Sequence, residues 1–249
     1  MGKVAIVTGA SRGIGACVAA GLAEDGYTVA LTARSKEALE EVAASIRSKV
    51  GRGNGKDKGG SDKGAGSVDV LTFPLDVQDR AAVDEMVASV VSSHGRIDLL
   101  FNNAGAGGQG SVDLTHEEFD HLVSVNLKGA FNFLKAVVPV MQNQKEGTII
   151  NVASRAGKIG FLNSGAYSAS KFGLVGLSES LYRELCPQNI KVTCLCPSWV
   201  DTEMTKEAPV NKDEMLVSDD LLKTVRWLIS MSPAAVVKDL IIECKTRIF

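Results

Sequence analysis

The chain has 249 residues, a formal net charge of −2, 45% apolar residues and only 5% aromatic residues. A near-neutral charge without a long basic stripe excludes nucleic acid and anionic membrane surfaces as the main partner, and no apolar run is long enough to span a bilayer. The length allows one large α/β domain or two small ones.

Apolar runs alternate with helical patterns along the whole chain. Strands are expected at residues 3–9, 28–34, 68–76, 96–105, 147–154, 190–197 and 238–246. Helices are expected at residues 14–25, 36–49, 80–94, 117–144, 166–186 and 219–230. This alternation predicts βαβ units with right-handed crossovers. We therefore expect an α/β fold, a doubly wound parallel sheet of about seven strands with helices on both faces.

Two segments interrupt this alternation. Residues 50–66 are rich in Gly, Lys and Asp and have no apolar period, which predicts a flexible solvent loop. A basic nucleic-acid tail is the alternative, but the segment has no aromatic residue and only a slight positive excess. Residues 203–217 follow a strand end and predict a short lid over a ligand crevice. With no linker and no repeat, we expect one domain over residues 1–249.

The cysteines and histidines show no metal-binding spacing. The five cysteines include no C-x-x-C pair, and the three histidines form no H-E-x-x-H pattern. Cys194 and Cys196 are two apart in an expected strand, so both should point to the same face. We expect reduced core thiols and no metal site, with a disulfide or a metal as the remaining alternatives for the cysteines.

The N-terminal residues "MGKVAIVTGA" run directly into a strand and a glycine turn. They leave no room for a secretory signal peptide, and position 6 is Ile6 where myristoylation requires Ser or Thr. We expect a cytoplasmic protein, or an organellar one if a transit peptide precedes this sequence.

A glycine cluster, Thr8-Gly9-Ala10-Ser11-Arg12-Gly13-Ile14-Gly15, separates the first expected strand from the first helix. Glycines at this position let backbone N–H groups approach a pyrophosphate at the positive end of a helix. The spacing is G-x-x-x-G-x-G rather than G-x-G-x-x-G, and a plain tight turn is the alternative. Its place at the first βα turn favours dinucleotide binding.

The end of the second expected strand predicts which dinucleotide binds. NAD-binding folds of this kind usually place an acid there for the ribose 2′-hydroxyl. This strand instead ends Thr32-Ala33-Arg34-Ser35, and Arg12 projects from the glycine turn. Two guanidinium groups suit a 2′-phosphate. We expect NADP(H), unless Arg34 is merely a solvated residue at a strand end.

The stretch "YSASK" places Tyr167 and Lys171 four residues apart, one turn apart on a helix. This spacing is common by chance and carries little weight alone. It is one of seven motifs that occur in order: "TGASRGIG" at 8–15, "LDV" at 75–77, "NNAG" at 102–105, Asn126, "NVAS" at 151–154, "YSASK" at 167–171 and "PSWVDT" at 197–202. With these motifs the whole chain resembles the short-chain dehydrogenase/reductase family.

The resemblance implies a Rossmann-type fold and an NADP(H)-preferring carbonyl or 3-oxoacyl reductase. Its catalytic set corresponds to Asn126, Ser154, Tyr167 and Lys171. Its cofactor-binding positions correspond to Gly9, Ser11, Arg12, Gly13, Ile14, Gly15, Arg34, Ser35, Asp76, Val77, Asn103, Ala104, Gly105, Tyr167, Lys171, Pro197, Val200 and Thr202. One departure is Pro197-Ser198, where the family usually has Pro-Gly, and this serine could shift the loop slightly.

Carbonyl reduction needs a proton donor and a group that stabilises the developing oxyanion. The resemblance implies that Ser154 donates a hydrogen bond to that oxygen and that Tyr167 gives up its proton. A nearby cation lowers the pKa of a phenol, so we expect Lys171 to lower the pKa of Tyr167 and to bind the ribose. Asn126 is expected to kink its helix and anchor a water.

The substrate is a small carbonyl or alcohol compound that the sequence does not identify. Candidate pocket residues are Gln109, Arg155, Phe161, Trp199 and Met204, with Arg155 facing either solvent or an acidic substrate. A catalytically silent NADP(H)-binding redox sensor or scaffold is the alternative, although the complete catalytic set favours an enzyme. By analogy with the family, helices 117–144 and 166–186 are expected to form a homodimer or homotetramer.

Overall fold

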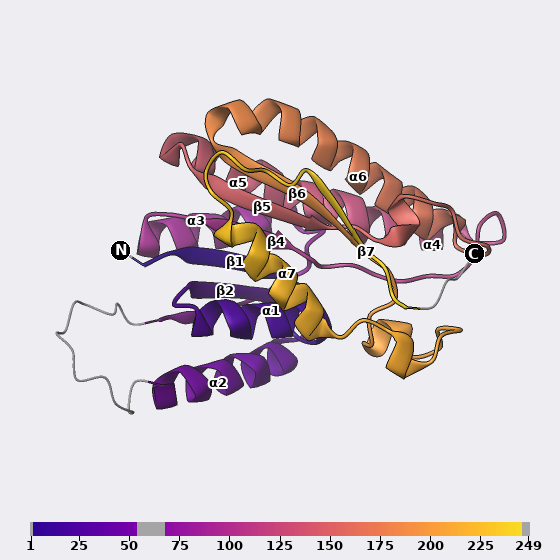
Figure 1. The fold of residues 1–249 in the computed structure, drawn as a ribbon, viewed down its shortest axis with the longest axis horizontal. Coiled ribbons are helices and arrows are strands. Elements are labelled where there is room, and N and C mark those ends of the chain that lie inside the picture. Colours follow the sequence, from indigo (N-terminus) through magenta and orange to yellow (C-terminus); the bar gives the residue numbers. More distant parts are fainter. Residues whose placement is uncertain (1, 54–67, 246–249) are drawn as a thin grey trace.

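The computed structural model describes residues 2–53 and 68–245, and these residues form one parallel seven-stranded sheet (Figure 1). The strand order is β3-β2-β1-β4-β5-β6-β7. The strands are β1 Val4–Thr8, β2 Thr28–Ala33, β3 Val70–Pro74, β4 Leu99–Asn102, β5 Gly147–Val152, β6 Ile190–Pro197 and β7 Asp239–Ile242. The expected doubly wound α/β fold is confirmed.

Helices cover both faces of the sheet. They are α1 Gly13–Glu24, α2 Lys36–Gly53, α3 Arg80–His94, α4 His116–Val123, α5 Ala130–Gln144, α6 Gly165–Leu185 and α7 Ser218–Ser230. Helices α1, α2 and α7 pack on one face, and α3, α5 and α6 pack on the other (Figure 1). Among the described residues, no helix combines the length and the apolar character needed to cross a membrane.

Strand β1 shows why the central strands read as continuous apolar runs. Its five residues are all buried. Val4 and Ile6 belong to the core on the α3/α5 face, whereas Ala5 and Val7 belong to the core on the α1/α7 face. Successive side chains of a strand point to opposite faces, so a strand covered on both sides must be apolar throughout.

The strand order reverses between β1 and β4, since β2 and β3 lie to one side of β1 and β4 to β7 to the other. In open parallel sheets, ligands bind beyond the carboxyl ends of the strands at such a reversal. The segments that follow Thr8 and Asn102 are therefore brought together at the expected ligand crevice.

Two expected elements differ in detail. The expected helix 117–144 contains a π-helical turn, Ser124–Gly129, between α4 and α5. Helix α2 continues to Gly53, so residues 50–53 of the expected loop are helical, and Val50 packs against the core. The rest of that loop, residues 54–66, lies outside the described residues. Segment 203–217 contains two 3-10 turns, Glu203–Thr205 and Lys212–Glu214, and its role as a lid stays a prediction.

Candidate active site

The glycine turn between β1 and α1 packs too closely for side chains. Gly9 and Gly13 have φ values of 65° and 55°, in the left-handed region that glycine tolerates. A Cβ on Gly9 would lie 2.9 Å from Ala104 Cα, and one on Gly15 would collide with the Gly9 carbonyl oxygen. Glycines without side chains therefore form the turn that precedes the N-terminus of α1, a geometry that suits a pyrophosphate.

The other predicted residues of this turn have different surroundings. Ile14 packs against the core, and Ser11 is partly buried. Arg12 precedes α1 with an extended backbone, and its side chain is exposed. Arg34, just beyond β2, is exposed as well. Both guanidinium groups are therefore accessible to a ligand at this edge of the sheet.

Ser35, a predicted cofactor-binding residue, has hydrogen-bond partners within the protein. Its hydroxyl accepts a hydrogen bond from the Ala38 N–H at 3.2 Å and so caps the start of α2. The same hydroxyl donates to the Glu37 carboxylate at 3.3 Å. Glu37, which the sequence reasoning did not weigh, thus places a negative charge beside Ser35, the residue that follows Arg34.

Thr8 connects two of the predicted cofactor segments. Its hydroxyl oxygen accepts hydrogen bonds from the N–H groups of Asn103 at 2.9 Å and Ala104 at 2.8 Å. The Asn103 side chain returns a hydrogen bond to the Thr8 carbonyl at 2.9 Å. Sequence reasoning gave Asn103 and Ala104 as cofactor-binding residues, but gave Thr8 no role of its own. A buried threonine that ends a parallel strand is the signal that could have identified it.

The segment after β6 reaches the same glycine turn. A Cβ on Gly13 would lie 3.3 Å from Thr202 Cγ2. Thr205 fixes this segment, because its hydroxyl donates to the Val200 carbonyl at 2.5 Å and accepts from the Thr202 N–H at 3.1 Å. Pro197 ends β6 itself. The predicted residues of this segment thus lie at the carboxyl edge of the sheet.

Asp76 and Val77 lie just after β3 in a turn that leads into α3. The Asp76 carboxylate accepts the Gln78 N–H at 2.9 Å, and the Val77 carbonyl accepts from the Asn132 side chain at 2.9 Å. The second bond ties this turn to α5. The Asp76 carboxylate would have to bind a ligand while it also accepts the hydrogen bond from the Gln78 N–H.

Asn126 lies in the π-helical turn and is fully buried. Its Oδ1 accepts from the Ala106 N–H at 2.8 Å, and its Nδ2 donates to the Ala106 carbonyl and to Ser170 Oγ, both at 3.0 Å. Ser170 in turn donates to the Tyr167 carbonyl at 2.7 Å. The Asn126 side chain therefore holds α6 against the segment after β4. A water at this residue would have to bind its backbone.

Ser154 and Tyr167 form a hydrogen-bonded pair. Ser154 lies at the start of a 3-10 turn, Arg155–Gly157, and its Oγ also accepts the Ala156 N–H at 3.1 Å. Burial raises the pKa of the Tyr167 phenol, and the hydrogen bond with Ser154 lowers it by less. The phenol is therefore protonated at neutral pH.

Lys171 is buried on α6, with its ammonium 5.8 Å from the centre of the Tyr167 ring. The ammonium donates to the Val152 carbonyl at 3.0 Å and lies close to Gly105. Burial lowers the pKa of Lys171 to about 8. The expected net lowering of the Tyr167 pKa is wrong for this structure, because burial dominates at the phenol.

A family model described as short chain dehydrogenase matches residues 3–213. The chain belongs to the short-chain dehydrogenase family.

Several relatives of this short-chain dehydrogenase carry reductase names. The 3-oxoacyl-[acyl-carrier-protein] reductase FabG of Staphylococcus epidermidis is 36% identical over 230 residues, which cover 87% of this chain and 83% of the relative. The crystal structure of a betaketoacyl-[ACP] reductase from Bacteroides thetaiotaomicron is 40% identical, with a TM-score of 0.81, and the match covers 98% of this chain and 97% of that one.

A variant of actinorhodin polyketide ketoreductase, solved with NADPH, has a TM-score of 0.82 at 30% identity. The match covers 97% of this chain and 95% of that chain. Together these relatives support a carbonyl-reducing oxidoreductase of the short-chain dehydrogenase family, similar to 3-oxoacyl reductases.

The predicted pocket residues of this short-chain dehydrogenase differ in burial and in contacts. Arg155 forms an ion pair with Glu243, so its guanidinium already has a carboxylate partner. Met204 is exposed and lies over Gly107, where a Cβ would be 3.2 Å from Met204 Cγ. Gln109 is exposed, and Phe161 and Trp199 are partly buried. Their roles in substrate binding stay predictions.

Proposed function

We propose that this short-chain dehydrogenase is an NADPH-dependent carbonyl reductase for aldehydes, ketones or 3-oxoacyl compounds, acting as one domain over residues 1–249. The observation that carries the proposal is the hydrogen-bonded pair of Ser154 and Tyr167, with the Lys171 ammonium 5.8 Å from the tyrosine ring. Lys171 also lies beside Gly105, in the segment that Thr8 fixes against the glycine turn.

The glycine turn supports NADP(H) as the cofactor. Its glycine backbone lies at the N-terminus of α1, where N–H groups can bind a pyrophosphate, and the exposed Arg12 and Arg34 offer guanidinium groups for a 2′-phosphate. The polyketide ketoreductase solved with NADPH gives independent support. When bound, NADPH supplies the hydride for the reduction.

The protein's own groups orient the carbonyl and move the proton. Ser154 donates a hydrogen bond to the carbonyl oxygen, which stabilises the negative charge that develops there. Tyr167, whose phenol is protonated at neutral pH, transfers its hydroxyl proton to that oxygen. Lys171, with a pKa of about 8, faces the resulting phenolate and can exchange a proton near neutral pH. Asn126 positions α6 through Ser170.

The reaction is tested by following NADPH oxidation with a panel of aldehydes, diketones and 3-oxoacyl thioesters. Turnover with at least one class is expected, and the class that reacts fastest identifies the substrate group. Tight NADPH binding without turnover of any of them would instead support a silent NADP(H)-binding sensor or scaffold.

Arg34→Asp is expected to move the cofactor preference toward NADH. The variant loses a charge-assisted hydrogen bond to the 2′-phosphate and places a second acid beside Glu37. The kcat/KM for NADPH should fall roughly tenfold to a hundredfold. Lys49→Asp, the same charge change at the far end of α2, is the matched control and should leave the preference unchanged. An equal effect of both variants would contradict a specific 2′-phosphate contact.

The proposed homodimer or homotetramer forms through α5 and α6. Phe131 on α5 and Phe172 on α6 are 47% and 45% exposed, which is unusual for phenylalanine. Phe172→Glu is expected to reduce the mass measured by light scattering after size-exclusion chromatography. Trp227→Glu, at the 46% exposed Trp227 of α7, is the control and should keep the wild-type mass. A wild-type monomer would refute this proposal.

A further inference from the structure

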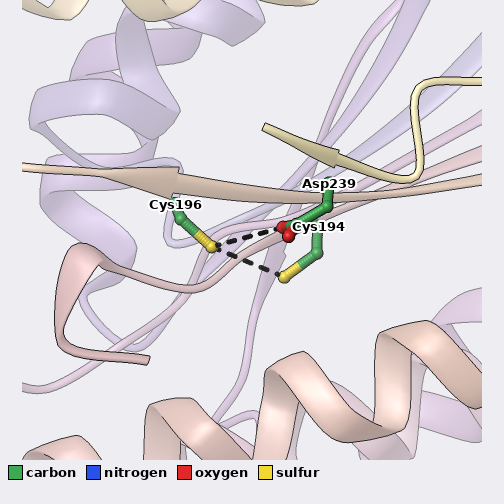
Figure 2. Close-up of side chains that lie close together, drawn as sticks. All are labelled: Cys194, Cys196 and Asp239. Atoms are coloured by element: carbon green, nitrogen blue, oxygen red, sulfur yellow. Dashed lines mark hydrogen bonds between the residues drawn. The ribbon is translucent and has the colours of Figure 1, made fainter. Parts of the chain in front are cut away.

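Strand β6 places two thiols side by side beneath α6, outside the proposed reaction site. Cys194 and Cys196 are 3% and 0% exposed, and their sulfur atoms are 3.8 Å apart (Figure 2). Residues i and i+2 of a strand share a face, as the sequence predicted for this pair. Both are free cysteines.

A carboxylate from the neighbouring edge strand completes the group. Asp239 of β7 pairs in register with Cys194, and its Oδ1 lies 3.9 Å from Cys196 Sγ (Figure 2). The two sulfurs and the Asp239 oxygen all lie within 4.8 Å of one another. The other carboxylate oxygen, Oδ2, binds the Lys158 ammonium at 2.5 Å, so the carboxylate is oriented with Oδ1 toward the sulfurs.

These separations match the spacing of ligands around one tetrahedral ion. Two thiolates bound to zinc at about 2.3 Å and at the tetrahedral angle are about 3.8 Å apart, and a thiolate and a carboxylate oxygen are about 3.5 Å apart. The observed distances of 3.8 and 3.9 Å require little movement of either strand.

The charge of the group selects a divalent ion. Asp239 and Lys158 neutralise each other in an ion pair. A divalent ion that displaces the two thiol protons to solvent adds two positive charges and leaves two thiolates, so the site again has no net charge. A monovalent or trivalent ion bound to both thiolates would leave a net charge in a largely buried site, which is costly.

The same geometry disfavours a disulfide between the two cysteines. Alternate residues of a strand have Cα atoms about 6.7 Å apart, close to the upper limit for a disulfide, whose Cβ atoms must approach to about 3.8 Å. That approach would bend β6 where Cys194 and Cys196 pair with β7. A metal ion joins the sulfurs without this distortion.

We propose that Cys194, Cys196 and Asp239 bind one borderline-soft divalent metal ion, of which Zn²⁺ is the representative. Asp239, with its side chain 31% exposed, gives the ion access from the edge of the sheet and leaves room for a water as fourth ligand. Lys158 orients the carboxylate from outside the ligand set. The proposal departs from the sequence prediction of no metal, because Asp239 is distant in sequence from both cysteines.

The test is a Co²⁺ titration of the reduced, chelator-treated full-length protein. We expect one ion per chain, with the visible bands of a tetrahedral site and a near-ultraviolet thiolate-to-cobalt band, both abolished by added Zn²⁺. Cys194→Ser and Cys196→Ser should each remove or strongly weaken the thiolate band. Cys17→Ser and Cys186→Ser, which change cysteines outside the group, should leave it unchanged.

Asp239→Asn tests the contribution of the carboxylate to metal binding separately from that of the thiols. It should weaken Co²⁺ binding by at least about tenfold, since loss of even an outer-shell partner has effects of that size, while a weaker thiolate band remains. Alkylation followed by mass spectrometry of wild-type protein gives a readout that needs no variant, because Zn²⁺ should protect Cys194 and Cys196 together. Absence of a thiolate band in wild type, its survival in both serine variants, or a disulfide forming without metal uptake would each overturn the proposal.

Discussion

Replacing Tyr167 with phenylalanine is expected to lower kcat for carbonyl reduction by about 10²–10⁴-fold, the usual contribution of a positioned general acid. The change removes the hydroxyl that is hydrogen-bonded to Ser154 and leaves the ring in its place beside Lys171. Binding of NADPH should fall far less than kcat, because the phenol proton acts on the substrate oxygen. Steady-state kinetics with the best substrate and a fluorescence titration with NADPH measure the two effects separately.

Tyr182→Phe is the matched control, since Tyr182 lies on the same helix and packs against the core on the α3/α5 face. It should retain kcat within a few-fold. If Tyr167→Phe kept more than about a tenth of wild-type kcat, Tyr167 would not be the proton donor, and Ser154 or a water would have to supply the proton.

The arrangement of the sheet could be predicted because it follows from local patterns. A strand covered on both faces must be largely apolar, as residues 4–7 of β1 are, and each helical stretch between strands forces a parallel crossover. The ordered motifs then place the glycine turn, Asn126 and the "YSASK" helix at the carboxyl edge of the sheet.

What sequence reasoning could not supply are contacts between residues distant in the chain. The π-helical turn at Asn126 depends on its side chain bonding Ala106 and Ser170, which no periodicity reveals. The approach of Asp239 to Cys196 depends on the register of β6 and β7. Likewise, the strength of burial at Tyr167 depends on the packing around it, which is why the direction of its pKa shift was mispredicted.

Replacing Lys171 with methionine is expected to stabilise the cofactor-free protein while removing most of its activity. The lysine is 4% exposed, and burial lowers its pKa from 10.5 to about 8. Keeping it charged inside the folded protein therefore costs free energy, up to about 3 kcal/mol, partly offset by about 1 kcal/mol for its hydrogen bond to the Val152 carbonyl. Methionine retains an apolar stem without the charge, so Tm should rise by a few degrees.

Activity should change in the opposite direction. Without the ammonium near the Tyr167 ring, nothing at that position stabilises the phenolate left after proton transfer. A loss of about 10²-fold or more in kcat is expected, comparable to removal of one charge-stabilising group. A variant that is more stable yet nearly inactive would identify Lys171 as a residue kept for function at a cost in stability.

The pH dependence of the stability difference between Lys171→Met and wild type distinguishes the loss of a buried charge from a general improvement in packing. Because the folded-state pKa of about 8 lies below the unfolded value of 10.5, the unfolded chain binds more protons between these two pH values. Wild-type stability therefore gains a contribution from Lys171 as pH rises through this window, and the advantage of Lys171→Met should shrink there.

Calorimetry below pH 8 and near pH 10.5 measures this advantage. The protein is treated with a chelator beforehand, because bound metal would alter the charge at Cys194 and Cys196. Lys191→Met, which also removes an ammonium bonded to backbone carbonyls, is the control and should show no gain. An advantage of Lys171→Met that did not vary with pH would mean that the buried charge is not its cause.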